Sequence, residues 1–170
     1  INDTQVFKDK LKEIVGNDND SLIIMEKVFY WIQDHVRYVA FEDGIMGYKP
    51  QSADKVYNLL YGDCKGMANL TKHMLKSIGF DARLTWIGTN DIPYSNDIPM
   101  LGVYNHMICT VFLKGKPYYI DCTENFISID DYAERIQGRP IMIENGSKYL
   151  SHTIPSANDE RNLITVNQKM

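Results

Sequence analysis

The 170-residue sequence lacks the features that mark a membrane-spanning or nucleic-acid-binding protein. No apolar run approaches the roughly 20 residues that a helix needs to cross a bilayer. Lysine and arginine number 18 against 22 aspartates and glutamates, and no stretch gathers the basic residues as a phosphate backbone requires. The sequence therefore predicts no membrane-spanning helix and no nucleic-acid partner.

Cysteine is also scarce, with only Cys64, Cys109 and Cys122. Three cysteines allow at most one internal disulfide and leave at least one thiol over, which points to cysteine chemistry more than to a disulfide framework. A chain of this length can bury a core without disulfides or metals, so we expect one compact domain over residues 1–170. Because the chain opens on Ile1 without a methionine, we expect it to be processed or part of a longer protein.

Hydrophobic spacing changes its period halfway along the chain. The first half predicts helices over residues 4–15, 21–38, 52–60 and 64–78, the last of which ends at Gly79. The second half predicts strands over residues 80–87, 103–113, 118–122, 141–144 and 148–150, with Lys114-Gly115 and Asn145-Gly146 as hairpin turns. Helices followed by strands indicate an α+β fold with an antiparallel sheet. The long loop over residues 89–102, with two prolines, is expected to border a functional cleft.

Cys64 is the candidate nucleophile because it follows Gly62-Asp63 at the start of a predicted helix. The free N–H groups and the positive end of the helix dipole at such a position stabilise a thiolate. The alternative is that Cys64 is a small apolar side chain packed under the helix, since free cysteine is among the most buried residue types.

A nucleophilic thiol needs a base, and the position of each histidine narrows the choice. His73 follows Cys64 by nine residues on the same helix, so it points from the opposite side. His35 lies among core-facing residues of the second helix and His152 lies near the C-terminus, where a satisfied or surface histidine is the simpler interpretation. His106, at the start of a predicted strand, remains the candidate base.

The hairpin register supplies a partner for His106. A two-residue turn at Lys114-Gly115 pairs positions that sum to 229, which places Asp121 one diagonal step from His106 on the same face of the sheet. Asp121 could then orient the imidazole, as the third member of a triad does. The alternative is a strand-end histidine and a turn-capping aspartate. The same register places Cys109 and Cys122 on the other face, about 8 Å apart, too far for a disulfide.

These residues lie in three ordered blocks that resemble the bacterial transglutaminase-like domains, relatives of the papain-type cysteine peptidases. The blocks are Tyr-Gly-Asp-Cys-Lys-Gly-Met-Ala at 61–68, Tyr-Asn-His at 104–106 and Tyr-Ile-Asp-Cys-Thr at 119–123. The similarity starts near residues 28–32 and includes Gly-Tyr-Lys-Pro at 47–50. It implies a papain-like α+β fold with the nucleophile at a helix start packed on an antiparallel sheet.

The resemblance also implies a reaction. Cys64 would be the nucleophile, His106 the general base and acid, and Asp121 the orienting carboxylate, in thioester chemistry on peptide or protein amides without a metal or organic cofactor. Tyr38 is the positional candidate for a second oxyanion donor beside the Cys64 N–H, or else an ordinary core or surface tyrosine. Lys65 departs from the aromatic or bulky residue that often follows the family cysteine. An exported bacterial protein of the cell envelope is the implied setting.

The same residues allow two other interpretations. A structural zinc site is disfavoured because close ligand pairs are missing and Cys122 points away from Asp121. A transglutaminase-like binding module would keep the three residues while recognising a peptide or glycan without turnover. Fast modification of Cys64 by a small thiol reagent in the folded protein alone would favour the enzyme.

Overall fold

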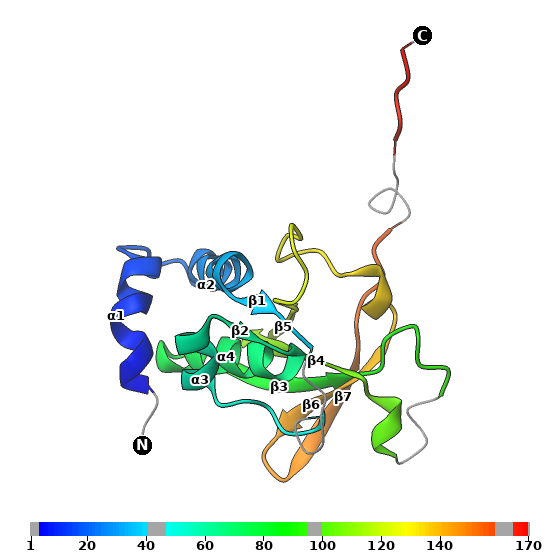
Figure 1. Ribbon diagram of the computed structural model, residues 1–170, viewed down its shortest axis with the longest axis horizontal. Helices are drawn as coiled ribbons and strands as arrows, with labels where there is room; N and C mark the ends of the chain where they lie inside the picture. The colour runs from blue at the N-terminus through cyan, green and yellow to red at the C-terminus, as the bar shows by residue number, and fades with distance from the viewer. Residues whose placement is uncertain (1–3, 41–46, 95–99, 159–164, 170) are drawn as a thin grey trace.

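The computed structural model describes residues 4–40, 47–94, 100–158 and 165–169. Figure 1 shows the helices and strands that they form. In chain order these elements are α1 Thr4–Val15, α2 Ser21–His35, β1 Arg37–Tyr38, α3 Ala53–Leu59, β2 Tyr61–Gly62, α4 Cys64–Ser77, β3 Asp81–Ile87, η2 Leu101–Val103, β4 His106–Leu113, β5 Lys116–Ile120, η3 Glu134–Ile136, β6 Pro140–Asn145 and β7 Lys148–Thr153. Helices precede the main sheet along the chain, so the predicted α+β class is confirmed.

The main sheet has five antiparallel strands in the order β5-β4-β3-β6-β7. Strands β4 and β5 pair with Cys109 opposite Ile120 and Leu113 opposite Lys116, which confirms the register predicted from the two-residue turn. Lys114 and Gly115 in that turn have φ angles of 51° and 79°. Two positive φ values match the twist of the flanking strands, and glycine adopts such a value at little cost.

Helix α4 is the centre of the packing. It contacts α1, α2 and α3 as well as strands β3 and β4, and it lies beside β3 in Figure 1. Cys109 and Cys122 are buried in the same core cluster, and both are free thiols, as the register predicts.

The second helix is shorter than its apolar spacing predicts. It ends at His35 because Val36 turns extended, with φ −105° and ψ 113°. Tyr38 therefore lies in β1, where it pairs in parallel with Gly62 of β2, and not at the end of a helix. The helical spacing could not show this pairing because its partner lies 24 residues further along the chain.

Two other boundaries also differ from the prediction. The last hairpin turns at Gly146-Ser147, since Asn145 still pairs with Lys148; Gly146, with φ 63°, occupies the first turn position. Strand β7 then continues to Thr153, so His152 lies in a strand and not in a frayed terminus. The strand predicted from residue 103 begins at His106, because Leu101–Val103 forms a short 3₁₀ helix. Among the described residues, no helix is long and apolar enough to span a bilayer.

Candidate active site

Cys64 is the first residue of α4, as its sequence position predicts. Asp63 caps the helix: its backbone is extended and its Oδ1 accepts a hydrogen bond of 2.7 Å from the Gly66 N–H. The N–H groups of this first turn have no acceptor within the helix, so their dipoles favour negative charge at the sulfur. The Cys64 side chain is buried, with 2% of its surface exposed.

The segment before the cysteine is held in place by the β1–β2 pair. The Val39 N–H donates to the Gly62 carbonyl at 2.9 Å, and Tyr38 lies opposite Gly62. This pairing places Tyr38 beside the residue two positions before Cys64, with 41% of its surface exposed. Its role as an oxyanion donor stays a prediction.

His106 and Asp121 come together between β4 and the end of β5. His106 Nε2 donates to Asp121 Oδ2 at 2.8 Å, and both side chains are buried. The second carboxylate oxygen, Oδ1, accepts from the Thr123 N–H at 3.1 Å and from the Thr123 hydroxyl at 2.7 Å. Because both oxygens are engaged, the carboxylate has a fixed orientation toward the imidazole.

The Cys64 thiol lies near enough to His106 to raise the pKa of the imidazole. Since Nε2 of the imidazole faces Asp121, Nδ1 is the ring nitrogen left for the sulfur. Burial lowers the pKa of His106, but the charge of Asp121, the hydrogen bond to Asp121 and the nearby Cys64 thiol outweigh it and raise this pKa from 6.5 to about 9. Burial likewise opposes ionisation of Asp121, but His106 and Thr123 hold the pKa of its carboxyl below the usual value. These directions favour a charged imidazole beside a charged carboxylate.

Two charged residues border this group without having been predicted there. Arg135 Nη2 donates to the Thr123 hydroxyl at 3.0 Å and lies 3.5 Å from Asp121 Oδ2. Lys65 Nζ lies 4.0 Å from the Cys64 sulfur and 2.6 Å from Asp63 Oδ2. The Asp-x-Thr spacing at 121–123 could have indicated the threonine contacts, because aspartate often bonds the backbone two residues on. Nothing in the sequence around Arg135 marks its position.

The other three histidines lie in different surroundings. His35 is exposed, bonds the Trp31 carbonyl at 2.9 Å through Nδ1 and stacks on the Trp31 ring. Nδ1 of His152 lies 3.1 Å from the Tyr119 hydroxyl. His73 is half-buried in the second half of α4. Within the described ranges, no three His, Cys, Asp or Glu side chains group as a metal site would require.

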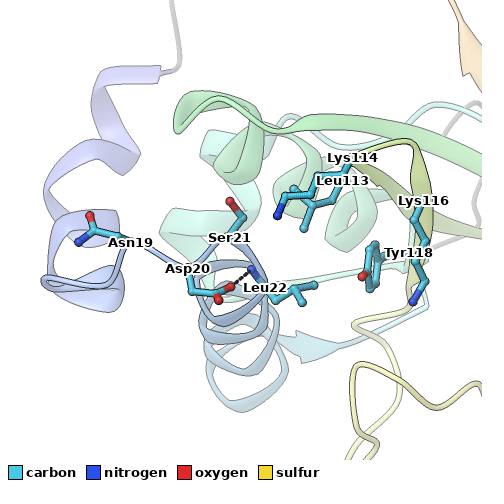
Figure 2. Close-up of a pocket in the computed structure, with 8 residues that line it drawn as sticks. All are labelled: Asn19, Asp20, Ser21, Leu22, Leu113, Lys114, Lys116 and Tyr118. Atoms are coloured by element: carbon cyan, nitrogen blue, oxygen red, sulfur yellow. Dashed lines mark hydrogen bonds between the residues drawn. The ribbon is translucent and has the colours of Figure 1, made fainter.

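The cavity in Figure 2 is a separate feature. It has a volume of about 390 Å³ and lies between the start of α2 and the β4–β5 turn. Asp20 caps α2 there by accepting from the Leu22 N–H at 2.8 Å, and Lys114 and Lys116 lie across from it. Strand β4 separates this end from His106 by about 23 Å, at 3.3 Å per residue. The cavity is therefore remote from the candidate site.

Helices that precede an antiparallel sheet, with a cysteine at the start of α4, form the α+β fold of a transglutaminase-like protein. The family model of the transglutaminase-like superfamily matches residues 8–120, and the chain belongs to that superfamily. Among curated proteins, no sequence matches it.

Solved structures share this fold at low sequence identity. A candidate protease from Parabacteroides distasonis superposes with a TM-score of 0.67 at 13% identity, over 90% of this chain and 28% of that one. A candidate cysteine protease from Cytophaga hutchinsonii gives 0.56 at 15% identity, over 71% and 38%. Calcium-bound LapG from Legionella pneumophila gives 0.60 at 14% identity, over 94% and 88%. The chain thus spans well under half of the first two proteins.

Proposed function

We propose that the protein is a cysteine-dependent enzyme that cleaves or transfers amide and acyl groups through a thioester. Cys64 is the nucleophile, His106 the general base and acid, and Asp121 the residue that orients His106. The observation that carries this proposal is the position of the His106 ring, which bonds the Asp121 carboxylate and lies near the Cys64 thiol. Membership of the transglutaminase-like superfamily supports it.

In the resting site the Cys64 proton lies on His106, so the reaction begins with attack of the thiolate sulfur on a carbonyl carbon. The negative charge on the carbonyl oxygen is held by the Cys64 N–H and, as a second donor, by the Tyr38 hydroxyl. When the C–N bond breaks, His106 gives its proton to the leaving amine and a thioester remains. Water or a second amine then gives a proton to His106 and attacks the thioester, and the sulfur leaves as thiolate.

The substrates are peptide or protein amides. Two structural neighbours are candidate proteases, which supports this class of substrate. Whether the second step is hydrolysis or transfer depends on whether water or an amine reaches the thioester. No metal or organic cofactor takes part in these steps, which the chain's own residues supply.

Trapping of the acyl-enzyme tests the proposal directly. The protein is treated with a p-nitrophenyl ester and with a panel of peptides, and intact mass and peptide mapping locate any acyl group. We expect one acyl group on Cys64, lost by hydrolysis as incubation in the buffer continues or on addition of an amine, and none in Cys64→Ala. Acylation at other residues only, unchanged in the alanine variant, contradicts the proposal.

A second candidate function is a binding module that recognises a peptide or glycan without turnover. It is favoured by the burial of Cys64 and His106, which are 2% and 3% exposed, because a substrate carbonyl must reach the sulfur. Peptide binding by titration calorimetry, without acylation of Cys64 and with slow thiol labelling at every pH, would support it over the enzyme.

We also propose, from the family resemblance, that the protein acts in the bacterial cell envelope. Fractionation of the producing cells, with immunodetection of the chain, tests this location. Recovery in the cytoplasmic fraction alone contradicts it.

A further inference from the structure

Lys65 is a buried cation beside the candidate nucleophile. Its side chain is 2% exposed, and its Nζ lies 2.6 Å from Asp63 Oδ2, whose side chain is 4% exposed. The same Nζ lies 4.0 Å from the Cys64 sulfur. A lysine is almost never buried this fully unless it is paired, so the ammonium position is fixed by Asp63.

Asp63 divides its two oxygens between two tasks. Oδ1 caps α4 by accepting from the Gly66 N–H, and Oδ2 holds the ammonium of Lys65. The helix cap and the lysine are therefore positioned by one carboxylate. As a result, the ammonium and the first turn of α4 both present positive charge to the same sulfur.

The charged groups around the sulfur differ in what they can do. His106 lies near the thiol and pairs with Asp121, whereas Lys65 pairs with Asp63. In the proposed reaction His106 gives its proton to the leaving amine and becomes neutral. Lys65 keeps its charge through every step, and a cation 4 Å from a thiolate in a buried site attracts it strongly.

We infer that Lys65 is the fixed counter-cation of Cys64, which stabilises the thiolate in the resting protein and when the sulfur leaves the thioester. The role of Lys65 when the sulfur leaves the thioester rests on the proposed function. Its role in the resting protein does not, because stabilisation of the thiolate is measured without a substrate. Lys65 takes no part in proton transfer.

Alkylation of Cys64 by iodoacetamide, followed against pH with peptide mapping, tests the inference. In Lys65→Met, which keeps the length of the side chain and removes its charge, we expect alkylation about tenfold slower at pH 6 and equal to wild type at high pH, where every thiol is ionised. Lys72→Met is the matched control: Lys72 is on the same helix and pairs with Glu144 at 2.5 Å. Its profile should equal that of wild type.

Equal profiles for Lys65→Met and wild type overturn the inference. If Lys65→Met does not fold, Asp63→Asn provides a second test. It removes the negative charge that pairs with Lys65, so its effect on the Cys64 thiolate should be opposite to that of Lys65→Met. Asparagine also caps helices, and loss of the carboxylate leaves the ammonium less compensated, so alkylation at pH 6 should be faster. Unchanged or slower alkylation overturns the inference.

The two proposals can fail separately. If Cys64→Ala loses turnover while Lys65→Met and wild type have equal alkylation profiles, the proposed function is supported and the role of Lys65 is contradicted. If the alkylation profile of Lys65→Met is shifted but the wild-type protein forms no acyl-enzyme, Lys65 is supported as the counter-cation of the Cys64 thiolate and the proposed function is contradicted.

Discussion

The three cysteines are equally hidden, yet their surroundings differ in kind. Cys64, Cys109 and Cys122 are 2%, 0% and 5% exposed. Cys64 lies at a helix start with an imidazole and an ammonium beside it. Cys109 and Cys122 lie in the apolar core, where burial raises the pKa of Cys109 far above its usual value and that of Cys122 to about 12. Exposure therefore does not distinguish the candidate nucleophile from the structural thiols, whereas the charges near each sulfur do.

Removing the sulfur is expected to have the largest effect. Cys64→Ala and His106→Ala should each abolish turnover, by up to about a millionfold, because nucleophile and base act as one unit. Acylation and peptide cleavage assays measure the loss, with circular dichroism to confirm the fold. Cys109→Ala is the matched control and should keep turnover; wild-type turnover in Cys64→Ala would overturn the mechanism.

Thiol labelling in the folded protein should separate the three cysteines by about a thousandfold or more. All three thiols are buried, but burial in the apolar core keeps Cys109 and Cys122 protonated, whereas the imidazole and the ammonium beside Cys64 favour its reactive thiolate. A thiol-reactive dye should therefore modify one cysteine rapidly, and two more only in denaturant. Peptide mapping identifies each site. Two fast sites, or fast labelling of Cys122, would show that burial does not protect the core thiols.

Asp121→Asn should reduce turnover by about a hundredfold, less than loss of Cys64, since nucleophile and base remain. Asparagine cannot hold the imidazolium charge, so the pKa of His106 should also fall. The pH profile of turnover measures both effects. Asp131→Asn serves as the control because it removes an equal charge from the segment that precedes η3. An equally large loss of turnover in Asp131→Asn would indicate a general charge effect.

The charge on His106 should make the folded protein less stable as pH rises. Its pKa is raised from 6.5 to about 9, so its contribution to stability is complete below pH 6.5 and lost as pH passes 9. The free energy of unfolding should fall by about 3 kcal/mol over this interval. Denaturant melts at several pH values measure it. His106→Gln should flatten the dependence, and an unchanged slope in that variant would assign it to another group.

Arg135→Met should produce the smallest effect, about a tenfold loss of turnover, because Arg135 supports Asp121 without touching the sulfur or the imidazole. Its guanidinium contacts the Thr123 hydroxyl and lies near Asp121 Oδ2. A positioning role predicts a change in the pH profile of turnover, which a purely structural role would not produce. Arg83→Met, which breaks a surface pair with Asp81, is the control.

Local rules explain why much of the site could be predicted from the sequence. Gly62-Asp63 before an apolar helical pattern indicates a capped helix start, which placed Cys64. The two-residue turn at Lys114-Gly115 sets the pairing of β4 with β5, so the neighbourhood of His106 and Asp121 follows from counting residues.

Tertiary contacts explain what could not be predicted. The strands β1 and β2 have two residues each, too few to show an alternation of apolar and polar residues. Their pairing places Tyr38 in a strand, whereas the sequence predicted it in a helix. Arg135 reaches Asp121 only because the chain folds back after β5 through η3. Lys65 looks like a solvent-facing helix residue until its pairing with Asp63 is seen.

The separation along the chain of the three site residues has a consequence for the order of folding. His106 and Asp121 lie on the arms of one hairpin, 15 residues apart, so they can meet within microseconds of chain collapse. Cys64 must wait for α4 to dock on the sheet, a contact that closes a much longer loop and forms more slowly. We therefore expect His106 and Asp121 to meet before Cys64 joins them, so that the candidate site is complete only when the domain is complete.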